Sequence, residues 1–227
     1  MTMGSVLGEA WSLYTRFFVR FVVLALVVFG VINLFFALIA VAVGRDNFGA
    51  AFLVGLLGVV ASVVGSYWLQ GAFVFAVQDV RDGTFDASTQ QIFARVRPFL
   101  GTLITAGIVG GLGVAAGFVL LIVPGLILMT IWALLSPVIV LEGKGVGESF
   151  GRSRELVRGN GWTVFGIILV TAILSSIAAG ILRAVFSFLP YFLEILIGST
   201  VAQAIVAPFS AIAVALIYFQ ISDRESA

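Results

Sequence analysis

The stretch EGKGVGESFGRSRELVRGNGW, residues 142–162, holds the densest group of charges in this chain and lies between two long apolar runs. Its basic residues are Lys144, Arg152, Arg154 and Arg158. Guanidinium and ammonium groups bind phosphate oxygens well, because each donates several hydrogen bonds from a positive charge. We therefore predict that these four side chains contact the headgroups of anionic membrane lipids.

Two further segments show the same combination of basic and apolar residues. SVLGEAWSLYTRFFVRF carries Arg16 and Arg20, and DASTQQIFARVRPFL, which we expect to begin its helix at Asp86, carries Arg95 and Arg97. In both segments, and again around Arg152, apolar residues recur at steps of three and four, which is typical of an amphipathic helix. We expect three such helices on the cytoplasmic face. Arg16, Arg20, Arg95 and Arg97 are the expected secondary headgroup contacts.

Nothing in the sequence indicates catalytic chemistry. The chain has no cysteine and no histidine, so it has no thiolate nucleophile, no imidazole base and few means of binding a transition metal. No nucleophile-and-base pair, phosphate-binding loop or metal-ligand cluster is visible. We predict that the protein is not an enzyme and uses no cofactor or metal. A net charge of +1 gives no argument for a nucleic-acid partner.

Polar residues inside the apolar runs offer a second chemistry. Asn33, Gln70 and Gln203 lie in uncharged segments, where amide side chains mostly form hydrogen bonds between helices. The same amides could line a polar path between helices, so a permease or lipid translocator is the alternative function. No ionisable residue clearly lies deep within an apolar run, which argues against a coupled pump.

The composition determines the class of protein that positions these residues. Hydrophobic residues make up 61% of the chain and charged residues 10%, which would leave a soluble globule with too little polar surface. The uncharged run 98–141 would form a helical rod of about 66 Å, roughly twice a hydrocarbon core, so it must fold back. We predict an all-α integral membrane protein with six spans, near residues 21–43, 50–77, 99–122, 125–141, 163–182 and 195–221.

The turn within the 98–141 run is predicted at Pro124, which would sit in the first turn of the following helix, where its missing N–H does little harm. Gly107, Gly111, Gly113 and Gly117 then form two pairs spaced four residues apart. Such pairs allow a neighbouring helix to approach closely.

Counting basic residues between the spans predicts the orientation. With six spans, both termini and the connections 79–98 and 142–162 share one side, which holds ten of the twelve Lys and Arg residues. Only Arg45 and Arg183 remain on the other side. Because basic residues concentrate in cytoplasmic loops, we expect both termini in the cytoplasm.

The order of segments also predicts an internal repeat within a single transmembrane domain, residues 1–227. Each amphipathic segment precedes a pair of spans, which divides the chain into units 5–78, 86–141 and 146–221. The sequence identity between these units is weak. Shared requirements for entering a membrane would produce a similar pattern.

The run LLIVPGLILMTIWALLSPVIVLEGKGVGESFGRSRELVRGNGWTVFGIIL resembles the membrane domain found with bacterial glycerophosphoryl diester phosphodiesterases and related uncharacterised multi-span proteins. The resemblance rests on Pro124-Gly125, Glu142-Gly143, the small and basic residues of 149–158, Gly159-Asn160 and Trp162. It implies a multi-pass architecture in the bacterial cytoplasmic membrane. The phosphodiesterase activity is not carried over, because this chain has no histidine and no room for the catalytic domain.

Taken together, these patterns predict a non-catalytic membrane protein that binds anionic lipid headgroups or organises the membrane. Membrane lipids are the expected partners. A cytoplasmic protein docking on the charged stretch 142–162 is the competing use of the same residues, and the sequence does not indicate an oligomeric state.

Overall fold

The computed structural model describes residues 2–42, 48–81 and 87–225, and these residues form helices and no strand. Six helical stretches within them are long and apolar enough to cross a membrane, which confirms the prediction of an all-helical chain with six candidate spans. The elements are α1 (Met3–Arg16), α2 (Phe18–Ala42), α3 (Phe48–Arg81), α4 (Thr89–Val96), η1 (Arg97–Phe99), α5 (Leu100–Leu120), α6 (Ile122–Ile131), α7 (Leu135–Glu142), α8 (Val146–Val157), α9 (Gly161–Phe186), α10 (Tyr191–Leu193), η2 (Glu194–Ser199) and α11 (Thr200–Glu225).

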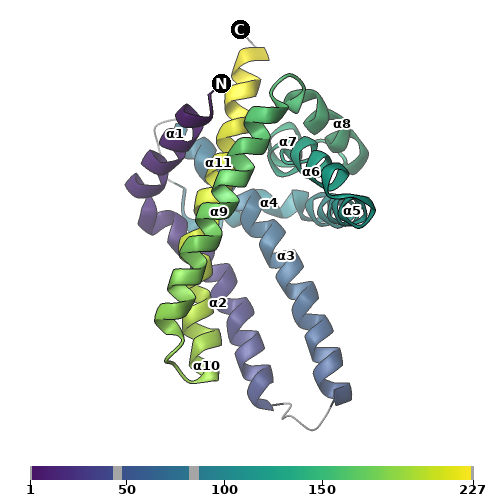
Figure 1. Cartoon of the computed structure of the whole chain (residues 1–227). Helices are drawn as coiled ribbons and strands as arrows, with labels where there is room; N and C mark the ends of the chain where they lie inside the picture. Colours follow the sequence, from purple (N-terminus) through teal and green to yellow (C-terminus); the bar gives the residue numbers. More distant parts are fainter. Residues whose placement is uncertain (1, 43–47, 82–86, 226–227) are drawn as a thin grey trace.

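Four long helices form a stem. In Figure 1, α2, α3, α9 and α11 run lengthwise, and both termini lie at the same end of the molecule. The central helix is α11, which packs against α2, α3 and α9. Its side chains Ile212, Leu216 and Ile217 are fully buried. Because α11 contacts all three other stem helices, its apolar surface holds the stem together.

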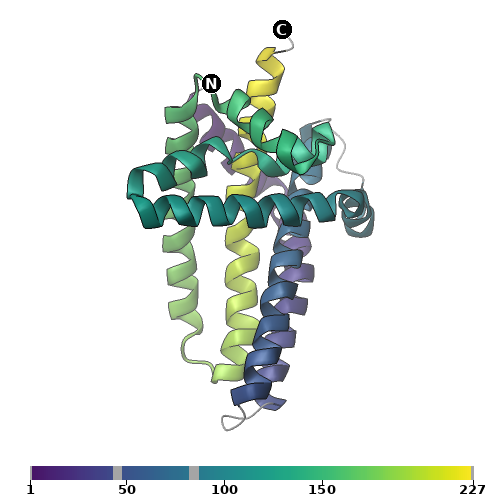
Figure 2. The same ribbon diagram turned by 90° about the vertical axis from the view of Figure 1, so that its right-hand side faces the viewer.

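The hairpin of α5 and α6 lies across the stem instead of along it. Figure 2 shows α5 crossing in front of the stem, with α6 folded back beside it. Where α5 meets α3, a Cβ atom on Gly107 would overlap the Tyr67 ring. Where α5 meets α6, a Cβ atom on Gly117 would lie 2.9 Å from the Cα atom of Gly125. The α5 glycines therefore permit the close contacts predicted for them, except Gly111, whose Cβ position has no neighbour within 4 Å.

The turn between α5 and α6 falls earlier than predicted. Leu121 is the extended residue between the helices, with φ −162° and ψ 150°, and α6 begins at Ile122. Pro124 therefore lies inside the first turn of α6, where a backbone N–H would have no partner within the helix. The proline marks the start of a helix, as predicted, but the turn itself precedes it.

A shorter helix precedes each pair of apolar helical stretches: α1 precedes α2 and α3, α4 precedes α5 and the stretch of α6 and α7, and α8 precedes α9 and α11. The N-cap of α4 is Ser88, whose hydroxyl accepts from the Gln91 N–H while the Gln91 side chain accepts from the Ser88 N–H. The predicted start of this helix, Asp86, lies outside the described residues.

Helix α1 places its apolar side against α11. Val6, Ala10 and Tyr14 are buried there, and the Tyr14 hydroxyl donates to the carbonyl oxygen of Ile205 at 2.8 Å. Burial raises the pKa of Tyr14 to about 12, so the hydroxyl remains a neutral donor. These three residues of α1 are thus covered by protein, while Trp11 of the same helix remains 60% exposed.

The crossing of α5 over α3 gives a first prediction. Gly107→Leu should lower the free energy of unfolding by about 1–3 kcal/mol, because the new side chain must displace the Tyr67 ring from a packed contact. Gly101→Leu is the matched control, since Gly101 lies in the same helix with nothing within 4 Å of its Cβ position. Thermal unfolding of both variants in detergent would measure the difference, and equal midpoints would contradict this account of the crossing.

Candidate functional site

The ends of α7 and α11 meet α8 around the carboxylate of Glu142. Arg152 Nε donates to both carboxylate oxygens at 3.2 Å, and the Tyr218 hydroxyl donates to Oε1 at 3.0 Å. Arg152 also pairs with Glu225 in the last turn of α11, with 2.5 Å between Nη2 and Oε2. We call Glu142, Arg152, Tyr218 and Glu225 the Glu142 cluster. The hydrogen bond to Glu225 raises the pKa of Arg152, so its guanidinium stays charged.

This cluster changes the interpretation of two predicted headgroup contacts. Arg152 is engaged by two carboxylates, and Lys144 Nζ lies 3.9 Å from a Glu142 oxygen. The physical reason is the burial of Glu142, whose side chain is only 19% exposed and so needs a positive partner within the protein. We therefore do not keep Arg152 among the headgroup contacts.

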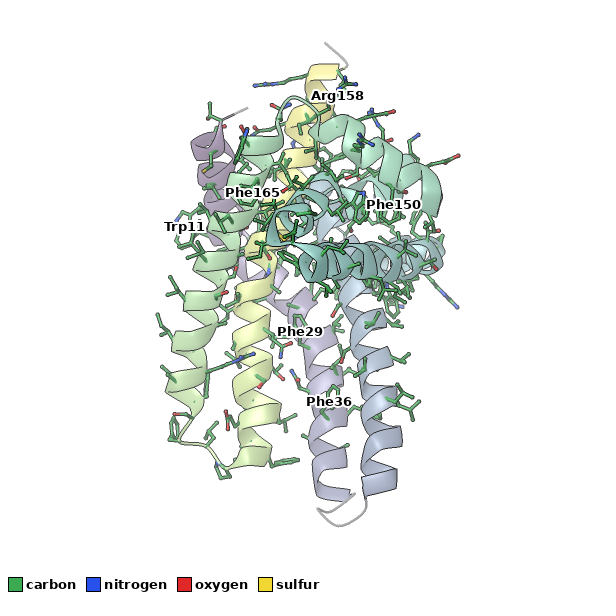
Figure 3. The ribbon with its side chains drawn as sticks, turned by 45° about the vertical axis from the view of Figure 1, so that its right-hand side comes forward. Trp11, Phe29, Phe36, Phe150, Arg158 and Phe165 are labelled. Atoms are coloured by element: carbon green, nitrogen blue, oxygen red, sulfur yellow. The ribbon has the colours of Figure 1, made fainter. Side chains whose placement is uncertain are left out.

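Arg154 and Arg158 lie on the opposite side of α8 from Arg152. In a helix, side chains two residues apart point to opposite sides, and side chains four residues apart point to the same side. Both arginines are exposed, and neither forms an ion pair with any residue that the structure describes. Trp162, in the first turn of α9, is 86% exposed. We call Arg154, Arg158 and Trp162 the α8 basic face; Figure 3 shows Arg158 near the end of the molecule at which both termini lie.

The secondary set of predicted basic contacts divides in the same way. Arg95 pairs with Asp79 at 2.7 Å and lies over the Phe75 ring, so it fastens α4 to α3. Arg16, Arg20 and Arg97 are exposed on other elements. The structure therefore does not gather the eight predicted basic residues into one site.

A cavity of about 520 Å³ lies where α5 crosses the stem. Small-molecule sites in proteins have volumes of about 300–1,000 Å³. Side chains from α2, α3, α5, α6, α7 and α11 line this cavity, and none of the described lining residues is charged. Its polar lining residues are Ser66, Tyr67, Gln70, Ser136 and Ser210. The cavity therefore suits an uncharged and largely apolar group.

The predicted polar path is not assembled. Of its three residues only Gln70 lines the cavity. Asn33 is buried and its amide donates to the Thr200 hydroxyl at 3.1 Å, which joins α2 to α11. Gln203 donates to the carbonyl oxygen of Ser199, within its own helical stretch. Asn33 therefore makes the interhelical bond expected of an amide in a membrane protein.

The sequence interpretation did not identify Ser153, which supports the wall of the cavity. The helix that enters as α6 is interrupted at residues 132–134 before α7 begins. The buried Ser153 hydroxyl donates to the carbonyl oxygen of Ile131 at 2.8 Å and accepts from the Leu134 N–H at 3.2 Å. Ser153 thus satisfies two backbone groups that the interruption leaves without helical partners. Pro137 is the sequence signal for this interruption of the helix, because a proline has no N–H and clashes with the carbonyl four residues earlier.

Comparison with known proteins identifies the family to which this chain belongs. A family described as "Domain of unknown function (DUF7847)" matches residues 67–221. The matched region begins at Tyr67, where α5 crosses α3, and contains the whole α8 basic face. It holds Glu142, Arg152 and Tyr218 but ends before Glu225. No curated protein and no solved structure matches the chain.

The Glu142 cluster gives a second prediction. Arg152→Ala should lower the free energy of unfolding by about 1–3 kcal/mol, because a largely buried carboxylate loses its hydrogen-bonded guanidinium and keeps only Lys144, at 3.9 Å, as a positive neighbour. Arg154→Ala is the matched control, since it removes an exposed guanidinium from the same helix. Thermal unfolding in detergent compares the two, and equal loss in both variants would show that the cluster does not hold α7, α8 and α11 together.

Proposed function

Because this chain belongs to the family described as a domain of unknown function, DUF7847, we propose a function for it from its own geometry. It is a non-catalytic, multi-pass membrane protein that binds anionic lipid headgroups at the α8 basic face. One observation carries this proposal: Arg154 and Arg158 are exposed without an ion pair among the described residues, and Trp162, four residues after Arg158 in the sequence, is exposed as well.

The composition of this face fits a membrane surface. Tryptophan concentrates at the level of the lipid headgroups, where its ring meets both apolar and polar surroundings. Arginine donates two hydrogen bonds at once to a phosphate group. The face also lies where α8 leads into α9, one of the six candidate spans. A headgroup at this position would contact the guanidiniums while its acyl chains run alongside α9.

The exposed surface of the stem supports placement in a bilayer. Val31, Leu57 and Ile181, on three different stem helices, are each at least 60% exposed. Apolar surface of this extent is covered by lipid or by another protein. Ten of the twelve basic residues fall to one side of the predicted spans, and we place that side, with both termini, in the cytoplasm of a bacterial cell. Of the other two, Arg183 lies in the last turn of α9, and Arg45 lies outside the described residues.

We further propose that α1, α4 and α8 are the cytoplasmic amphipathic helices of three related units, 5–78, 86–141 and 146–221. The recurring order of one shorter helix before two candidate membrane spans supports this division. Their charged sides would face the headgroups while their apolar sides pack on the protein, as α1 does on α11. The crosswise course of α5 and α6 distinguishes the second unit from the other two.

The proposal includes no catalytic step and no cofactor. The resemblance to the membrane domain found with glycerophosphoryl diester phosphodiesterases stays a prediction, and it contributes a membrane architecture alone. A soluble protein docking on the α8 basic face would use the same arginines. An experiment that distinguishes the two must therefore measure bound lipid directly.

Native mass spectrometry of the detergent-purified protein with phosphatidylglycerol tests the headgroup site. Arg154→Ala/Arg158→Ala should weaken phosphatidylglycerol binding by about 30-fold, because each basic residue contributes about 1 kcal/mol at an anionic surface. Binding of the zwitterionic phosphatidylcholine should not change. Arg183→Ala, at the other end of α9, is the control. Equal phosphatidylglycerol binding by wild type and double variant would exclude the α8 basic face as the site.

The cavity beside Gln70 favours a second candidate, a permease or lipid translocator. In proteoliposomes, flux of a solute or labelled lipid that is lost in Gln70→Ala but kept in Gln203→Ala would support it, because only Gln70 lines the cavity. On the headgroup-binding proposal we expect no flux in either variant or in wild type.

A further inference from the structure

The cavity under α5 is separate in chemistry from the α8 basic face. No charged side chain lines it among the described residues, and most of its lining is apolar, including Phe29, Phe73 and Val214. The interruption between α6 and α7 contributes Trp132 and Ala133 to its wall. Non-helical backbone at membrane depth occurs where it is buried in protein or lines a cavity. A broken helix fastened by Ser153 therefore indicates a built site.

Glycines in α5 keep the cavity open. Gly107 allows α5 to touch Tyr67, and Gly111 lies one helical turn further along on the same side of α5. Gly111 lines the cavity, and its Cβ position has no atom within 4 Å. Because Gly111 is exposed and the space beside it is open, a larger side chain there would take up room at the edge of the cavity without displacing other residues.

The surface around this hairpin indicates what can enter the cavity. Leu112, next to Gly111, is 67% exposed, and residues 119–123 at the tip of the hairpin are five consecutive apolar residues between 63% and 87% exposed. In a bilayer, such a surface is in contact with lipid acyl chains. An acyl chain is therefore the apolar group present in greatest amount beside the cavity.

We infer that the cavity binds an acyl chain of a membrane lipid. The chain lies between α3, α5 and α11, and the ester region of the same lipid accepts a hydrogen bond from the exposed Gln70 amide. The site does not select headgroup charge, because no described charged residue lines it. The α8 basic face, in contrast, would select anionic headgroups, so either site can exist without the other.

Filling the cavity tests this inference. Wild-type protein in a delipidating detergent is mixed with palmitoyl-oleoyl phosphatidylcholine, a lipid without net charge, and the lipid-bound fraction is counted by native mass spectrometry. Gly111→Leu should lower the ratio of lipid-bound to free protein by about tenfold. Gly101→Leu, the same substitution in the same helix but outside the cavity, should leave the ratio unchanged.

Further variants separate the possible results. If Gly111→Leu fails to fold, Val114→Phe fills the cavity from a second lining position of α5. Arg154→Ala/Arg158→Ala should keep phosphatidylcholine binding, so loss of the headgroup site and loss of the chain site appear in different variants. Equal phosphatidylcholine binding by wild type and both cavity-filling variants would overturn the inference. So would equal loss in Gly101→Leu, or a wild-type protein that binds no phosphatidylcholine.

Discussion

Neutralisation of the Glu142 carboxylate is the constraint on which the arrangement of α7, α8 and α11 depends. In a chain with few charges, this carboxylate is largely buried, and Arg152 and Tyr218 bring it bonds from two other helices. Since Arg152 must face Glu142, Arg154 and Arg158 must face away from it. The exposure of the α8 basic face is thus a consequence of an internal ion pair.

A second constraint is the volume of side chains where helices cross. Gly107 lets α5 lie directly on Tyr67, and Gly117 lets α6 return against α5 at Gly125. These contacts hold the hairpin across the stem, and the cavity lies where α5 crosses it. The interrupted helix at residues 132–134 completes the wall, with Ser153 as the partner of its free backbone groups.

The structure holds two candidate sites of opposite character: the α8 basic face lies within the part of the chain that matches the family, residues 67–221, and so does most of the cavity lining, apart from Phe29 and Ser66. One is an exposed pair of guanidiniums beside a tryptophan, and the other is an uncharged cavity under a hairpin. A membrane lipid has a charged or zwitterionic head and apolar chains, so the two sites correspond to its two parts. The lipid binding that we propose would account for both with one class of ligand.

The sequence by itself determined the membrane class, the six candidate spans and the closeness of the α5 helix contacts, because hydrophobicity, helix length and glycine spacing are local properties. It also singled out Arg154 and Arg158, which the structure leaves exposed. Only the tertiary structure decided that Arg152 is an internal partner, that Gln70 is separated from Asn33 and Gln203, and that α5 crosses the stem. Each of these depends on which helix lies opposite a given side chain. The neighbouring helix is determined by packing and charge pairing between residues far apart in the chain. The periodicity of a single segment contains no information about these contacts.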